Sequence, residues 1–233
     1  MTPLRVRGYA VERFLGSGAS GAVWQARVLA SGTSVALKRI TVRDEEQRRR
    51  AHAEAALLAA LDHPNLVRLH SLLVTDEDVV LVLDLADGGS LARLLRARER
   101  LAPGEVITAI APAAAALAYL HDQGVVHGDV SAANILFTSS GAPLLSDVGV
   151  ARLTGDDADA EATPAYVDPA VAAGCVPGPP SDVFMLAGVA LHALTGAPPW
   201  PDATAEVALA RAARGVLADL PARLADAGTP PAM

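Results

Sequence analysis

The sequence has a single cysteine, no excess of basic residues, and no recognisable internal repeat. Cys175 has no second cysteine with which to pair, so a fold held by intrachain disulfides is excluded. The formal net charge of -7 argues against nucleic acid as the main partner, because phosphate binding needs a basic face. What remains is an acidic chain of 233 residues, long enough to bury a core as one large domain or as two lobes.

Long apolar runs are also scarce, although hydrophobic residues make up 52% of the chain and the mean hydropathy is +0.32. Much of this is alanine, which favours helices without making membrane spans. The longest run, residues 106–120, is shorter than the about 20 residues that cross hydrocarbon, and it contains Thr108 and Pro112. It predicts a buried helix that kinks or starts late at Pro112. No apolar run follows the basic residues near the amino terminus, so we expect no secretory signal, no membrane contact within this segment and a cytoplasmic location.

Strand patterns dominate the first eighty or so residues, and helical patterns fill the rest. An alanine-, leucine- and arginine-rich run over residues 44–61 predicts one helix among the strands. Ser90 is expected to cap the next helix, and Gly124 to end the apolar helix. The sequence therefore predicts an α+β fold of two unequal lobes, residues 1–86 and 87–233. The predicted strands, which would form a five-stranded antiparallel sheet, are residues 9–15, 22–28, 34–40, 69–74 and 79–85.

A glycine-rich segment, residues 16–21, fits the pattern G-x-G-x-x-G. A dinucleotide-binding fold would need a helix after these glycines, whereas the residues that follow predict a strand. The context favours a flap over the phosphates of ATP, and a plain hairpin is the simpler alternative.

A lysine and a glutamate that follow the glycine-rich segment could complete a phosphate-binding site. Lys38 ends the sequence Val-Ala-Leu-Lys on a strand whose other positions are apolar, so its ammonium would project into a cleft. Glu54, on the predicted helix, can hold Lys38 extended towards the α- and β-phosphates. Alone, each residue would be read as a surface charge.

The most specific segment is His-Gly-Asp-Val-Ser-Ala-Ala-Asn-Ile-Leu, residues 127–136, followed by Ser-Asp-Val-Gly, residues 146–149. Asp129 can orient an acceptor hydroxyl or take its proton, while Asn134 and Asp147 offer two oxygen ligands for Mg²⁺. This order of residues is improbable by chance. With the whole series in view, the chain resembles the eukaryotic-like serine/threonine protein kinases of bacteria, from about residue 9 to about residue 200.

The resemblance implies a bilobal protein-kinase-like fold that binds ATP and Mg²⁺ and acts on a protein substrate or a regulated partner protein. It also implies that residues 162–170 dock the substrate, that Asp182 braces the catalytic loop, and that Trp200 anchors a loop of the larger lobe. A simple helix cap is the alternative role of Asp182. The implied site residues are Asp129, Lys38 and Glu54 for catalysis; Gly16, Ser17, Gly18, Gly21 and Lys38 for the phosphates; Val23, Ala36, Leu136, the gatekeeper Leu83 and the hinge from Asp84 to Ala86 for adenine; and Asn134 and Asp147 for Mg²⁺.

The chain departs from the family pattern at several positions. Gly128 replaces the arginine after the histidine, which removes the usual basic partner of a phosphorylated loop. Ser131 replaces the lysine that contacts the transferring phosphate, so transfer should suffer more than ATP binding. The expected penalty is on the order of 10²–10³ in rate. Val148 replaces a phenylalanine, a mild change, and Ala170 replaces a glutamate.

Three functions stay open at this point. A serine/threonine protein kinase leads, and a pseudokinase that binds ATP as a scaffold or regulatory domain is second. The third is a small-molecule phosphotransferase of the aminoglycoside or choline kinase type, because residues 127–129 also resemble its loop; the docking segment and the Asp182 helix argue against it. We also expect the last helices of the larger lobe to be missing, with the apolar surface left there covered by a homodimer or a neighbouring segment.

Overall fold

The computed structural model describes residues 4–18, 21–42, 49, 55, 58–74, 78–148, 163–201, 204–215, 217 and 220–227. The chain separates into two compact units. One comprises Met1–Asp87 with Gly149–Ala160, and the other comprises Gly88–Val148 with Glu161–Met233.

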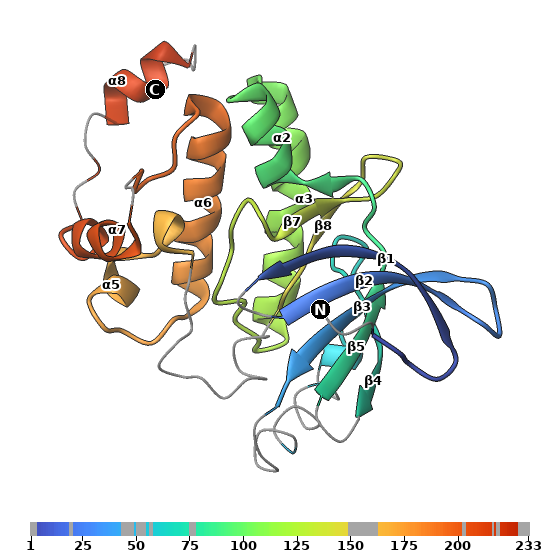
Figure 1. Cartoon of the computed structure of the whole chain (residues 1–233). Coiled ribbons are helices and arrows are strands. Elements are labelled where there is room, and N and C mark those ends of the chain that lie inside the picture. The colour runs from blue at the N-terminus through green and yellow to red at the C-terminus, as the bar shows by residue number, and fades with distance from the viewer. Residues whose placement is uncertain are drawn as a thin grey trace. The chain divides into compact units, whose positions relative to one another are not determined.

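A five-stranded antiparallel sheet forms the first unit, in the order β1-β2-β3-β5-β4 (Figure 1). The five-stranded antiparallel sheet predicted from the sequence is therefore confirmed. The strands are β1 (Tyr9–Gly18), β2 (Gly21–Val28), β3 (Ser34–Thr41), β4 (Leu69–Val74) and β5 (Asp78–Asp84).

Buried side chains lie on both faces of this sheet. Val35, Leu37 and Val80 belong to a cluster on one face, and Ile40 and Leu81 belong to a cluster on the other. Strands β3 and β5 occupy central positions, so their sequences read as nearly continuous apolar runs instead of alternating. The sheet therefore follows directly from the local pattern.

The helix predicted over residues 44–61 falls largely outside the described residues. Arg49, Ala55 and Leu58 are helical, and Ala55 packs in the cluster of Ile40. Glu54, the predicted partner of Lys38, lies outside the described residues.

Helices dominate the second unit, together with a three-stranded sheet of β6 (Gly89–Ser90), β7 (Ile135–Phe137) and β8 (Pro143–Leu145). Helices α3 and α6 pack against each other, and α3 also contacts β8 (Figure 1). The mostly helical second part is as predicted. Its helices are α2 (Leu91–Arg98), α3 (Pro103–Asp122), α5 (Pro169–Ala172), α6 (Pro179–Thr195), α7 (Ala205–Ala212) and α8 (Leu220–Asp226), with a 3₁₀ turn η1 at Pro164–Tyr166.

Helix α3 begins at Pro103 and continues through Pro112, so the late start is wrong, whereas the alternative of a kink at Pro112 stays a prediction. Proline fits the first turn at Pro103 because no N–H is needed there. The helix persists beyond Pro112 because residues spaced three and four apart, such as Ala113, Leu117 and Leu120, bury one continuous face. Within the described ranges, α3 alone is long and apolar enough to cross a membrane, a test that a core helix also passes.

The ends of α2 and α3 follow the predicted capping residues. The Oγ of Ser90 accepts a hydrogen bond from the backbone N–H of Arg93 at 3.3 Å. Gly124 has a φ of +71° just after the end of α3, the left-handed conformation that glycine adopts without strain. Gly124 therefore ends α3 just before residues 127–134, the loop that carries Asp129 and Asn134 and is called the catalytic loop below.

Candidate active site

Asp182 braces the loop that carries Asp129. Its side chain is fully buried near the start of α6; Oδ2 accepts from the backbone N–H of His127 at 2.9 Å, and Oδ1 accepts from that of Gly128 at 2.8 Å. The Nε2 of His121, at the end of α3, lies 2.8 Å from Oδ2. A buried carboxylate needs such donors. The predicted bracing is confirmed, and the simple-cap alternative is wrong.

The carboxylate of Asp129 is held on both oxygens. Oδ2 accepts from the Nδ2 of Asn134 at 2.9 Å, and the same nitrogen donates to the backbone oxygen of Asp129 at 2.8 Å. Oδ1 accepts from the backbone N–H of Thr163 at 2.9 Å and from its Oγ1 at 3.0 Å. These bonds fix the orientation of Asp129, which a group that handles a hydroxyl proton requires. The sequence placed Thr163 only in the docking segment and missed this contact.

His127 ties the loop to the residue before Asp147. Its Nδ1 accepts from the backbone N–H of Asp129 at 3.2 Å, which leaves the proton on Nε2, 2.8 Å from the carbonyl oxygen of Ser146. Ser146 donates to the carbonyl oxygen of Asn134 from its backbone N–H at 2.8 Å and from its Oγ at 3.1 Å. The loop and the end of β8 therefore hold Asn134 and Asp147 at neighbouring positions.

The donor atoms of Asn134 and Asp147 fit Mg²⁺. Both hydrogen bonds that Asn134 donates to Asp129 use Nδ2, so Oδ1 is the amide atom that can bind a cation. Asp147 adds a carboxylate, and its φ of +63° is in the left-handed region that aspartate tolerates better than most residues. Mg²⁺ prefers oxygen ligands and is commonly bound by one or two such side chains plus phosphate oxygens.

The strand register places four predicted nucleotide ligands on one face of the first unit's sheet. Lys38 on β3 pairs with Val23 on β2, and Ala36 pairs with Leu83 on β5. Paired residues share a face, and so do residues two apart on a strand. Lys38 is only 2% exposed, so its ammonium is shielded from water and depends on polar partners. The roles of these residues towards ATP remain predictions.

The flap glycines differ in what the fold requires of them. At Gly21, φ is +119° and a Cβ would lie 2.2 Å from the carbonyl oxygen of Arg39, so only glycine fits. At Gly16, a Cβ would meet nothing within 4 Å. Gly18 pairs with Gly21 at the end of the β1–β2 hairpin, and Ser17 is exposed beside it. The fold therefore explains Gly21 but leaves Gly16 open to a ligand role.

The remaining predicted adenine contacts lie at the end of β5, just after it, and on β7. The Oδ1 of Asp84 is 2.7 Å from the Nε2 of His70, and its Oδ2 accepts from the backbone N–H of Arg68 at 3.2 Å. Ala86 lies in the irregular segment after β5, and Leu136 is half-buried on β7. Their contacts with adenine stay predictions.

Tyr166 and His192 form a polar pair next to the catalytic loop. The Tyr166 hydroxyl lies 2.6 Å from the Nδ1 of His192. Burial raises the pKa of Tyr166 to about 12, partly offset by a hydrogen bond from the backbone of Ala132. Burial, and then the charge of Arg223, lowers the pKa of His192. At neutral pH the tyrosine therefore donates to a neutral imidazole, a pairing that the sequence did not reveal.

Trp200 anchors a loop of the second unit, as predicted, and that loop is the segment expected to dock the substrate. It is 2% exposed, its Nε1 donates to the carbonyl oxygen of Val167 at 2.9 Å, and its backbone N–H donates to that of Ala165 at 3.2 Å. Its ring stacks on Phe184 of α6 with centroids 6.5 Å apart. The segment after Thr163 is therefore fixed to α6.

Ser131 stands where the resemblance expects a lysine. It is 1% exposed, and in the described part of the chain its Oγ is the one buried side-chain polar atom that lacks a hydrogen-bond partner. A neutral hydroxyl cannot supply the charge of an ammonium, so the departure noted in the sequence carries through to the structure.

The chain belongs to the protein kinase domain family, whose model matches residues 9–224. Members of this family typically use ATP and Mg²⁺ and act on protein substrates. The chain is 37% identical over 215 residues to the serine/threonine-protein kinase PkaA of Streptomyces coelicolor, covering 82% of this chain and 39% of that protein. It is 35% identical over 205 residues to PknJ of Mycobacterium tuberculosis, covering 83% and 35%.

A relative outside bacteria is similar over a comparable share of the chain. The serine/threonine-protein kinase PLK4 of Aedes aegypti is 33% identical over 204 residues, covering 84% of this chain and 26% of that protein. The chain thus spans between 26% and 39% of the length of these three relatives.

Proposed function

We propose that this domain is a serine/threonine protein kinase that transfers the γ-phosphoryl group of ATP to a hydroxyl of a protein. The observation that carries the proposal is the geometry around Asp129, whose carboxylate is oriented by Asn134 and Thr163. The buried carboxylate of Asp182 holds the same loop by accepting two backbone hydrogen bonds. This support fits a carboxylate that must be held in one orientation to act on a hydroxyl.

Asp129 has room for a substrate hydroxyl. An ionised carboxylate offers about four acceptor sites. Oδ1 accepts two hydrogen bonds from Thr163 and Oδ2 accepts one from Asn134, which leaves capacity on Oδ2. A serine or threonine hydroxyl would donate to this oxygen and be oriented for attack, and Asp129 would take up its proton as the bond to phosphorus forms.

Other side chains would bind the nucleotide and the metal. Lys38 would hold the α- and β-phosphates, and Asn134 and Asp147 would hold Mg²⁺ through their oxygens. ATP and Mg²⁺, when bound, supply the transferable phosphoryl group and neutralise part of its charge. Because Ser131 offers no cation, we expect transfer to be slower by on the order of 10²–10³ than with a preorganised charge at that position.

Ser131 also favours a second candidate, a pseudokinase that binds ATP without transferring phosphate. A radiolabelled ATP assay with purified protein and a degenerate serine/threonine peptide library separates the two. We expect the wild type to label peptides, and Asp129→Asn, which cannot take up a proton, to lose about 10²-fold or more of this activity. Asp122→Asn, at the exposed end of α3, is the matched control and should keep it. Nucleotide binding with no labelling by the wild type would favour the pseudokinase.

A further inference from the structure

A cavity of about 1150 Å³ lies within the second unit, lined by residues of α2, the end of α6 and α8. Ala133 of the catalytic loop also lines it, directly before Asn134, which bonds Asp129. Ala133 is four residues from Asp129 in the chain, so their Cα atoms are at most about 14 Å apart. About four residues of extended substrate peptide cover the same distance. A polypeptide whose hydroxyl lies at Asp129 can therefore extend into the cavity.

The half-buried part of the lining is rich in hydrogen-bond donors. Because the Nδ1 of His192 accepts from Tyr166, its Nε2 carries the remaining proton. Among the described residues, Arg223 donates from Nη2 to the hydroxyl of Thr195 and to backbone carbonyl oxygens. These acceptors are neutral, so none of these bonds compensates the charge of Arg223, and none of them uses its Nε or Nη1, which could therefore bind a ligand.

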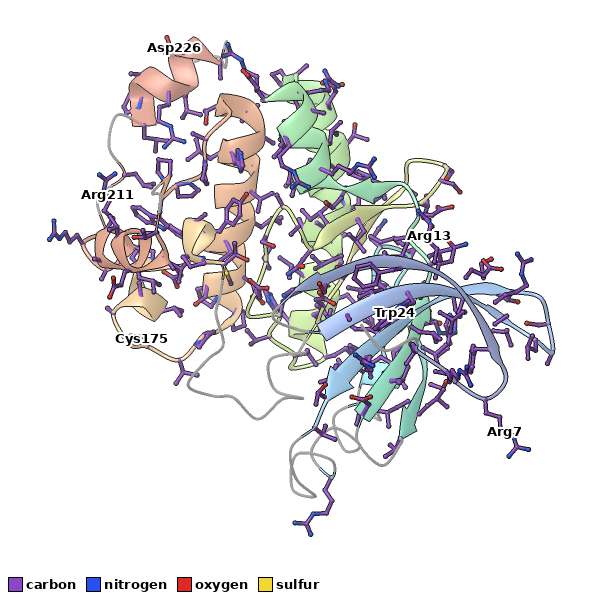
Figure 2. The ribbon with its side chains drawn as sticks, in the orientation of Figure 1. Arg7, Arg13, Trp24, Cys175, Arg211 and Asp226 are labelled. Atoms are coloured by element: carbon purple, nitrogen blue, oxygen red, sulfur yellow. The ribbon has the colours of Figure 1, made fainter. Side chains whose placement is uncertain are left out.

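Both signs of charge occur among the exposed residues of the lining. Arg96, Arg100 and Glu99 are exposed. Asp226, the last residue of α8, is exposed as well, and it is labelled in Figure 2. Exposed charges are strongly screened by water and salt. Half-buried Arg223 is screened less, so the inner part of the cavity presents positive charge and donors without a carboxylate of its own. Carboxylate and phosphate groups only accept hydrogen bonds, and they match the guanidinium fork.

We propose that this cavity binds the substrate polypeptide beside its acceptor residue and selects acidic side chains, which carry a carboxylate or a phosphate. The proposal rests on the proposed function, because it requires a protein substrate at Asp129. An occupied cavity would also contact the loop indirectly, since His192 holds Tyr166, whose hydroxyl receives a hydrogen bond from the backbone of Ala132.

The test is phosphorylation of an arrayed serine/threonine peptide library in which one position at a time, on either side of the acceptor, is set to Asp, Glu, phosphoserine, Ala, Lys or Arg. We expect wild-type protein to favour acidic residues over Lys and Arg by about tenfold or more at one or more positions within four residues of the acceptor, as for a charge pair worth about 1.4 kcal/mol. The Asp, Glu and phosphoserine arms distinguish carboxylate from phosphate as the preferred group.

Changes of charge then locate the preference. Arg223→Gln removes the half-buried charge of the cavity and keeps an amide donor, whereas Arg93→Glu changes an exposed residue of α2 outside the cavity. The double variant Arg96→Glu, Arg100→Glu adds two carboxylates to the exposed part of the lining. We expect Arg223→Gln to lose the acidic preference, the double variant to weaken it, and Arg93→Glu to keep it. A preference that Arg223→Gln retains, or labelling by wild type that is indifferent to charge or favours basic residues, overturns this inference alone. Failure of the wild type to label any peptide overturns the proposed function, and this inference with it.

Discussion

Removing the Asp182 carboxylate should be among the most damaging single changes in the second unit. Asp182→Ala leaves the backbone N–H groups of His127 and Gly128 and the Nε2 of His121 without their acceptor. Each buried donor left unsatisfied costs about 1–3 kcal/mol. Relief from burying the charge offsets part of this sum. We therefore expect a loss of about 3–5 kcal/mol in the free energy of unfolding, a large share of the about 5–15 kcal/mol typical of a domain.

Urea unfolding followed by tryptophan fluorescence measures this loss. The chain has two tryptophans, and Trp24→Phe leaves only Trp200, which reports on the second unit. Asp168→Ala is the matched control, because Asp168 is a less buried aspartate that accepts one hydrogen bond, from the backbone N–H of Ala170 at 3.1 Å, as a helix cap. Loss of such a cap costs about 1 kcal/mol.

The comparison of the two aspartates decides the outcome. If Asp182→Ala costs no more than Asp168→Ala, the three hydrogen bonds of Asp182 do not hold the loop, and the bracing argument fails. If the loss is as large as expected, Asp182→Asn should fall between the two. Asparagine keeps one accepting oxygen but turns an N–H group towards a backbone donor.

Three further predictions concern the flap, the catalytic loop and pH. Gly16→Ala should leave stability unchanged and weaken ATP binding in a calorimetric titration. Gly21→Ala should destabilise the first unit, because a side chain at that position collides with the backbone. Equal stability of the two variants would contradict the different roles of these glycines. Thr163→Val should lower kcat more than KM, because it removes one of the three hydrogen bonds that orient the Asp129 carboxylate, and Thr163→Ser should retain most activity. The pKa of His192 in the folded protein lies below its ordinary value of 6.5, so the unfolded chain binds this proton more readily. The free energy of unfolding should therefore fall as pH drops below about 6.5. His192→Gln should flatten this slope in urea midpoints measured from about pH 7.5 to about pH 5.

Local patterns in the sequence determined the elements of this protein and the identity of its catalytic loop. The apolar runs of β3 and β5, the turn glycines and the cap at Ser90 act over a few residues, so they could be read without a structure. The spacing from Asp129 to Asn134 is equally local, and the need of Asp182 for partners follows from burying a charge near the start of an apolar helix. The late helix start expected at Pro112 was wrong, because packing of the face around Ala113 outweighs the local effect of the proline.

Only the tertiary structure decided which groups meet. Thr163 reaches Asp129 across 34 residues of sequence, and Tyr166 reaches His192 across 26, and no local pattern specifies such pairs. The same holds for Gly16 and Gly21, which look alike in the motif and differ in backbone conformation and in what a side chain would touch. Propensity and periodicity act between near neighbours in the chain, whereas a site is assembled by the path of the folded backbone, which brings distant residues to hydrogen-bonding distance.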